Sequence, residues 1–147
     1  MTTVKDFARL GTLDSGLCVI STLRRDGTIQ SSVVNAGVLD HPVTNQPVVG
    51  LVARGGSVKL ANLRARPHAT VVVHAGFQWV AAEGTAELAG PDDDLAGIDP
   101  ERVRVLLRDV FTAAGGTHDD WPTYDRVMAE ERRAAVLITP VRVYSNT

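Results

Sequence analysis

A short segment with two glycines, a serine and a lysine is the part of this sequence best suited to bind an anion. It reads Gly-Gly-Ser-Val-Lys-Leu-Ala-Asn-Leu-Arg-Ala-Arg-Pro from Gly55 to Pro67. The pattern predicts one short helix with Ser57 as its N-cap, glycines that let the backbone approach a ligand, and a proline that ends it. The first amides of a helix carry the positive end of its dipole and attract phosphate. Lys59 in the first turn would add a full positive charge.

A lysine at this position opposes the helix dipole, because cations are favoured at the other end of a helix. A bound anion would remove that conflict. A solvated lysine on an ordinary connecting helix explains the same pattern, so the spacing alone leaves both interpretations open.

The segments around this helix have the composition of β-strands. Each is a run of apolar and β-branched residues bounded by turn formers, and Arg25-Asp26-Gly27 is typical of a hairpin turn. Pro140 indicates a bend or an edge position in the last run. The predicted strands are 17–23, 29–39, Pro47–Ala53, Ala69–Ala75, 78–88 and 134–144.

Three further segments are expected to be helical. Val4–Leu13 has its apolar residues on one face. Asp99-Pro100-Glu101 is typical of a helix start and Gly115-Gly116 of a helix end, and a second helix follows His118-Asp119-Asp120. Because the other connections are too short for parallel crossovers, we expect an antiparallel sheet closed into a barrel. The prediction is one domain over residues 1–147, mainly β (α+β), with six strands and flanking helices.

Strand 78–88 places a large aromatic residue on its polar face. Trp79 shares that face with Glu83 and Glu87, while the alternate positions are apolar or small. Such a tryptophan is either a lone surface residue or is covered by a partner chain or a flat ligand, and we favour the second.

Polar residues also interrupt the apolar strand 29–39. Ser31 and Asn35 lie on one face and Ser32 on the other, so at least one set is expected to face inward. Short polar side chains in a barrel wall can hydrogen-bond a planar heterocycle, although a serine in a hairpin strand can equally face water.

Composition argues against several classes of function. The net charge of -2 argues against nucleic acid as a partner. No apolar run approaches the roughly 18 residues of a membrane helix, and the first residues have no signal-peptide character, so we expect a cytoplasmic protein with no membrane contact. The single Cys18 excludes an internal disulfide and is expected in the core.

The sequence lacks the motifs of common hydrolases, nucleotide-binding proteins and metalloenzymes. Its four histidines, at positions 41, 68, 74 and 118, lack close metal-ligand spacing, so we expect no metal site. The acidic stretch Asp92–Asp94 is interpreted as a solvated loop. No side chain stands out as a catalytic residue.

Four segments resemble the split β-barrel flavin and deazaflavin proteins of the pyridoxamine 5′-phosphate oxidase-like group. They are Leu23–Ser32 around its Asp-Gly turn, Ser57–Ala69 with Lys-x-x-Asn-Leu-x-x-x-Pro, Val80–Ala86 with Glu-Gly-x-Ala, and His118–Tyr124. The resemblance covers nearly the whole chain. Within the group, the sequence is similar to the actinobacterial branch that binds coenzyme F420, a deazaflavin whose tail carries a phosphate and several glutamates.

The resemblance implies an FMN-binding type of split barrel, a homodimer, and a cofactor at the subunit interface. The cofactor phosphate would lie near Ser57 and Lys59, the wall from Ser32 to Asn35 would face the ring, and the partner subunit's Trp79 would border the pocket. The implied cofactor-binding residues are Ser32, Val33, Val34, Asn35, Arg54, Gly55, Gly56, Ser57, Lys59, Asn62 and Trp79.

The implied activity is hydride transfer between reduced coenzyme F420 and an activated double bond of a small organic substrate, with solvent or an unidentified side chain balancing the proton. One alternative is an FMN-dependent oxidase or reductase, because FMN ends at its phosphate whereas the F420 tail needs further cations, for which Arg54, Arg64 and Arg66 are available. The other is a non-catalytic carrier of flavin or haem.

Overall fold

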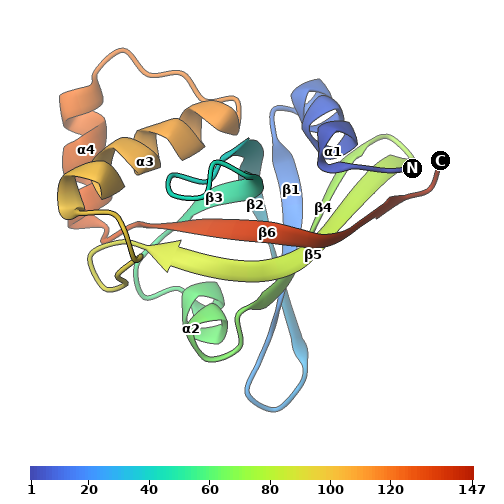
Figure 1. Cartoon of the computed structure of the whole chain (residues 1–147), viewed down its shortest axis with the longest axis horizontal. Coiled ribbons are helices and arrows are strands. Elements are labelled where there is room, and N and C mark those ends of the chain that lie inside the picture. The colour runs from blue at the N-terminus through green and yellow to red at the C-terminus, as the bar shows by residue number, and fades with distance from the viewer.

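Six strands form a closed antiparallel barrel in the order β1-β2-β3-β6-β5-β4 in the computed structural model (Figure 1). The model describes residues 1–147, apart from the side chain of Asp14. The prediction of a mainly β, six-stranded antiparallel barrel with flanking helices is confirmed. The strands are β1 Leu17–Leu23, β2 Ile29–Asp40, β3 Pro47–Ala53, β4 His68–Ala75, β5 Gln78–Ala89 and β6 Ala134–Ser145.

Two helices close the barrel from different sides. Thr3 and Asp6 form a capping box at the start of the first helix, which then buries Phe7 and Leu10 in the barrel core. Leu60 and Leu63 of the second helix join the same core. The helices lie above and below the barrel in Figure 1. They are α1 Val4–Gly11, followed by a 3₁₀ turn Thr12–Asp14, and α2 Val58–Ala65.

The barrel interior follows from strict alternation along the strands. Cys18 and Ile20 of β1 and Val71 and Val73 of β4 are buried, while the residues between them face outward. The Cys18 thiol donates to the Gly16 carbonyl, and burial raises the pKa of this thiol to about 12. The prediction that Cys18 is a core residue is therefore confirmed.

The two remaining helices cover the outside of the barrel at one end. They are α3 Pro100–Ala113 and α4 Trp121–Glu130, and both belong to the segment between β5 and β6. Leu106, Leu107 and Val110 of α3 pack against Leu137 of β6 in a second apolar cluster. None of the described helices has the length and apolar character needed to cross a membrane.

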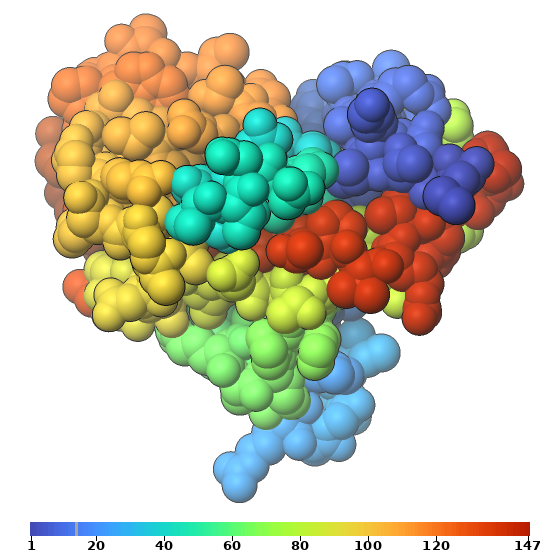
Figure 2. Space-filling model, viewed as in Figure 1, coloured from blue at the N-terminus to red at the C-terminus, as the bar shows by residue number. Residues whose placement is uncertain are grey.

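The end of α3 rests directly on the barrel because Gly37 of β2 and Gly16, directly before β1, lack side chains. A Cβ on Gly37 of β2 would lie 2.0 Å from the Ala113 carbonyl oxygen, and one on Gly16 would lie 2.3 Å from that of Ala114. Figure 2 shows α3 and α4 separated from α1 by a notch, and a cavity of about 470 Å³ lies between α1 and the end of α3.

The predicted bend at Pro140 is present as a break in register between β5 and β6. The register shifts at Glu83/Gly84, where Gly84 pairs with Pro140. A proline cannot donate to the ladder, so it is tolerated at a bulge inside a closed barrel. A Cβ on Gly84 would lie 2.0 Å from the Thr139 carbonyl oxygen, which explains why glycine is needed opposite the bend.

Candidate functional site

A cleft of about 430 Å³ opens between the barrel and the α3–α4 pair. One wall consists of β2 and the end of β3, and the other consists of α3, α4 and the start of β6. Five of the residues expected to bind a cofactor line it together: Val33, Val34, Asn35, Arg54 and Lys59.

Lys59 brings a positive charge into this cleft from the first turn of α2. Burial lowers the pKa of its ammonium, and the nearby Arg133 guanidinium lowers it further. No hydrogen bond or ion pair joins the Lys59 ammonium to another side chain that the structure describes. A desolvated cation without a carboxylate partner is costly, and it is a binding group for an anion that enters the cleft.

Arg133 is a second cation of the cleft, and Arg54 is a third. Glu131 lies between them, with its carboxylate 3.2 Å from the Arg133 guanidinium and 3.9 Å from that of Arg54. The Nε atom of Arg133 is buried without a hydrogen-bond partner in the described part of the chain. The Glu131 carboxylate is thus shared by Arg54 and Arg133, whereas Lys59 has no acidic partner among the described residues, and together these four side chains carry a net positive charge.

The α2 N-terminus has the predicted N-cap residue but not the expected capping bond. Ser57 has extended backbone and no side-chain cap hydrogen bond, and its Oγ is buried without a described partner. Gly55 donates its amide to the Glu131 carbonyl at 3.1 Å, and a Cβ there would lie 2.6 Å from the Arg132 carbonyl oxygen. Gly55 thus serves close packing against the start of β6. Gly56 has a φ of 79° and open space around it.

Strand β2 turns alternate residues toward the barrel interior and toward its outer face. Ser32 lies on the inward face, and its Oγ is buried without a described partner. Ser31, Val33 and Asn35 lie on the outer face, where Val33 is 67% exposed. The cleft is therefore lined by Val33 and Asn35 of the outer face and by Val34 of the inward face, while the Ser32 hydroxyl stays buried in the wall.

Asn62 does not reach the cleft in the way the resemblance implied. Its side chain is 6% exposed, and its amide donates to Thr22 Oγ1 at 3.0 Å, which in turn donates to Gln30 at 3.1 Å. Asn62 joins α2 to the end of β1, so we assign it a structural role.

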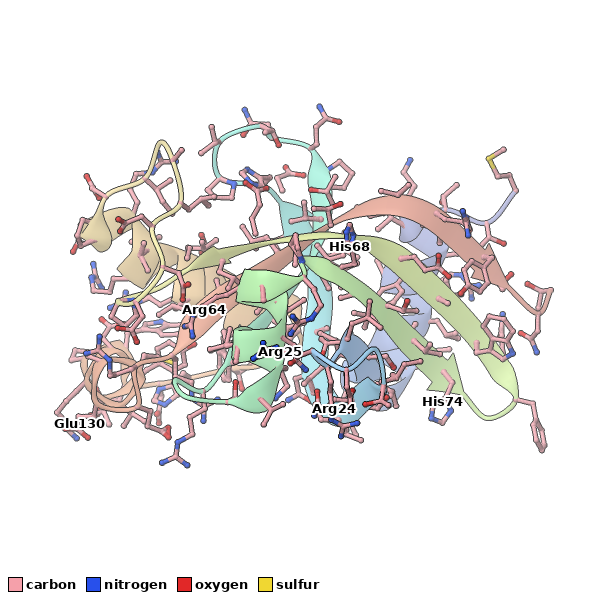
Figure 3. The ribbon with its side chains drawn as sticks, turned by 90° about the horizontal axis from the view of Figure 1, so that it is seen from below. Arg24, Arg25, Arg64, His68, His74 and Glu130 are labelled. Carbon is pink, nitrogen blue, oxygen red and sulfur yellow. The ribbon has the colours of Figure 1, made fainter. Side chains whose placement is uncertain are left out.

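Trp79 is also absent from the cleft within one chain. It starts β5 beside His74 of β4, and its ring packs edge-on against Tyr144 at 6.0 Å. Figure 3 shows His74 at the end of the barrel opposite Glu130. A contribution of Trp79 to a cofactor site therefore requires a second subunit.

The two arginines of α2 and its C-cap are already engaged. Arg64, seen on α2 in Figure 3, holds Asp93 through two hydrogen bonds of 2.7 and 2.8 Å. Arg66 donates to the Leu23 carbonyl at 2.9 Å. The interpretation of Asp92–Asp94 as a solvated loop is wrong at Asp93, which is 12% exposed, and Asp92 pairs with Arg132.

Several apolar and aromatic residues of the cleft were not predicted as site residues. Among them are Phe111, Tyr124 and Met128 of α3 and α4, which have the helical spacing of ordinary packing residues. Arg133 was missed because nothing in the local sequence distinguishes it from Arg132. In the structure Arg132 has a φ of 49°, and this turn separates the two side chains.

Histidines contribute little to the cleft. His41 is buried, with Nδ1 accepting the amides of Val43 and Thr44 and Nε2 lying 3.0 Å from Glu87, so it stabilises the β2–β3 loop. No group of three or more metal-ligating side chains gathers among the described residues. The cleft lining thus combines cationic side chains with apolar and aromatic ones, a composition that suits a flat molecule with an anionic group.

Comparison with known proteins agrees with this geometry. The family model described as pyridoxamine 5′-phosphate oxidase matches residues 4–146, so the chain belongs to this family of flavin-binding oxidoreductases. No curated protein matches the sequence.

Solved structures show the same fold at low identity. A conserved hypothetical protein from Mycobacterium tuberculosis matches with a TM-score of 0.69 at 20% identity, over 99% of this chain and 84% of that one. An F420 reductase matches with a TM-score of 0.60 at 14% identity, over 90% of this chain and 91% of that one. A pyridoxamine 5′-phosphate oxidase-related, FMN-binding protein from Nostoc punctiforme matches with a TM-score of 0.64 at 14% identity, over 93% of this chain and 77% of that one.

Proposed function

We propose that this protein is a coenzyme F420-dependent reductase that transfers hydride to an activated double bond of a small organic substrate. Lys59, Arg54 and Arg133 would hold the phosphate of the cofactor, and Val33 and Asn35 would face its ring. The observation that carries the proposal is a cleft lined by three cations, Lys59, Arg54 and Arg133, of which only the two arginines contact a carboxylate, that of Glu131. When bound, the deazaflavin ring supplies the hydride chemistry.

The protein residues bind and orient the cofactor and exclude competing reactions. Lys59 and Arg133 hold the anionic group, and Arg133 Nε and Ser57 Oγ are buried polar atoms that such a group can satisfy. The residues that line the cleft include no aspartate, glutamate or histidine. This composition fits hydride transfer, which needs no dedicated base, with the balancing proton supplied by solvent.

Tyr124 is the one hydroxyl-bearing aromatic residue in the cleft lining. Its OH donates to the Leu107 carbonyl at 2.9 Å, and burial raises its pKa to about 12. A phenol held in this way is a poor proton donor at neutral pH. We therefore assign Tyr124 to packing.

FMN is the second candidate cofactor, and a specific observation favours it. The arginines considered for the glutamate tail of F420, Arg64 and Arg66, already hold Asp93 and the Leu23 carbonyl. The three cleft cations and Glu131 leave about two positive charges, which matches a phosphate monoester near neutral pH. The F420 tail would have to rely on Arg54, which is 69% exposed.

A second copy of the chain is part of the proposal. The outer face of β1 and β2 carries exposed apolar residues, and Val19 and Val33 pair across the strands. Exposed apolar faces of this kind mark interaction surfaces. Val33 also lines the cleft, so a partner that covers this face would close the cleft from outside and bring its own Trp79 close to it.

Binding titrations test the proposed function. F420 and FMN are added separately to the wild-type protein and to Lys59→Met, and binding is followed by cofactor fluorescence. We expect tighter binding of F420 than of FMN, and a loss of roughly tenfold to a hundredfold for Lys59→Met, because a charge-assisted hydrogen bond contributes about 1.5–3 kcal/mol. The control is Lys5→Met, which removes the only other lysine, an exposed residue on α1.

Tighter binding of FMN would replace F420 with the second candidate. Unchanged binding of both cofactors to Lys59→Met would contradict the assignment of the cleft.

A further inference from the structure

We propose that Phe111 is the residue on which the flat ring of the cofactor stacks. This inference rests on the proposed function and adds a second, separable determinant to it. Lys59, Arg54 and Arg133 hold the anionic end of the ligand, whereas Phe111 selects for an aromatic ring at the other end.

The Phe111 side chain is partly exposed and lines the cleft from α3. Three other aromatic rings surround it. Tyr124 lies 5.1 Å from its centroid, Trp121 lies 6.2 Å away at 89°, and His118 lies 6.3 Å away. Aromatic pairs at these separations prefer offset and edge-to-face arrangements, so the cluster fixes the ring of Phe111 in one orientation.

Gly116 keeps Phe111 in this position. A Cβ at Gly116 would lie 2.5 Å from Cζ of the Phe111 ring and 2.6 and 2.7 Å from two further ring carbons. The Gly116 amide also donates to the Phe111 carbonyl at 3.0 Å, so backbone and ring are held together. Any side chain at position 116 would push the ring out of its place, which makes the glycine a determinant of the shape of the cleft.

The opposite wall is apolar and well anchored. Val33 and Val34 line the cleft from β2, and the same strand receives the end of α3 at Gly37. Because the Ala113 backbone packs directly on Gly37, the helix that carries Phe111 cannot approach or leave the strand freely. A planar ring thus enters a preformed slot between Val33 and Phe111, and preorganisation of this kind favours affinity.

Three ligands separate the two determinants. Riboflavin carries the ring without the phosphate, inorganic phosphate carries the anion alone, and FMN carries both. Dissociation constants are measured for the wild-type protein, Phe111→Leu, Gly116→Ala and Lys59→Met, by fluorescence for the flavins and by calorimetry for phosphate. Phe77→Leu is the matched control, because Phe77 is 97% exposed in the β4–β5 turn.

We expect Phe111→Leu and Gly116→Ala to weaken the binding of riboflavin and of FMN by about tenfold, since stacking on an aromatic side chain contributes on this order. The affinity for inorganic phosphate should not change in either variant. Lys59→Met should weaken the binding of phosphate and of FMN but not the binding of riboflavin. Phe111→Leu preserves apolar bulk. A melting temperature close to that of the wild-type protein would show that the fold of this variant is intact.

One outcome would overturn this inference alone. In it, the affinities for riboflavin and FMN stay unchanged in both Phe111→Leu and Gly116→Ala, while the affinity of Lys59→Met for FMN falls. Failure of the wild-type protein to bind riboflavin, FMN and F420 would overturn the proposed function together with it.

Discussion

Lys59 of α2 and Arg133 at the start of β6 bring two positive charges to the same cleft, and the proximity of Arg133 adds to the effect of burial in lowering the pKa of Lys59. Two like charges in a partly desolvated site destabilise each other. Binding of the proposed anionic ligand would relieve this repulsion, so that stability would be exchanged for binding at this point.

Lys59→Met is therefore expected to raise the melting temperature by a few degrees while it weakens binding of inorganic phosphate. The substitution removes a charge that has no acidic partner among the described residues and keeps the apolar stem in place. Differential scanning calorimetry and phosphate titration check the two effects. A fall in melting temperature would mean that the lysine stabilises the fold.

The pH dependence of anion binding follows from the same pair. A lysine with a lowered pKa loses its proton, and with it its attraction for phosphate, at a lower pH than the usual value of 10.5. We expect phosphate affinity to fall as pH rises toward this value from below. In Arg133→Gln the midpoint of this fall should move to higher pH, because a nearby positive charge is removed. The midpoint is measured by titration at several pH values, and no movement would show that Arg133 is remote from Lys59.

Asn62→Ala is expected to destabilise the fold without affecting the cofactor. The change leaves the buried Thr22 hydroxyl without its donor, which should cost about 1–3 kcal/mol in the free energy of unfolding. Urea denaturation measures the loss, and FMN titration of the folded variant should match the wild type. A selective loss of cofactor affinity would return Asn62 to the binding site.

Ile29→Asp tests the second copy of the chain. Ile29 is 64% exposed on the outer face of the hairpin and does not line the cleft, so a charge there should convert a dimer to a monomer. Analytical ultracentrifugation gives the oligomeric state. The control is Val105→Asp, a substitution of an exposed apolar residue on α3.

Trp79→Ala extends this test to the site itself. We expect it to weaken either dimer formation or cofactor binding, since Trp79 lies at the end of the barrel away from the cleft of its own chain. A wild-type monomer with full cofactor affinity would refute the proposed subunit arrangement.

Local pattern was sufficient to predict the barrel and the position of Lys59 in the first turn of a short helix. Strand alternation defines which residues of β2 face outward, and the glycines, the serine and the proline around Lys59 define α2. Asn62 lies on the same helix as Lys59, but the direction of its side chain depends on a contact with Thr22 of a strand that is distant in sequence, which the local pattern does not contain.

The remaining residues of the site depend on tertiary structure. Arg132 and Arg133 are neighbours in sequence, yet one pairs with Asp92 and the other lines the cleft. Phe111 and Tyr124 have the spacing of ordinary core residues, and only the docking of α3 on Gly37 shows that they form a wall. Sequence periodicity describes one element at a time and contains no information on such contacts.

Strands β5 and β6 pair with each other from Val80 and Ser145 to Ala89 and Ala135. The segment that contains α3 and α4 therefore connects the end of one strand to the start of its direct neighbour in the sheet. The barrel is closed by the pairing of the strands themselves, so this closure does not depend on the length or composition of the connecting segment. Substitutions in α3 and α4 can therefore change the aromatic wall of the cleft while the position of Lys59 on α2 is retained.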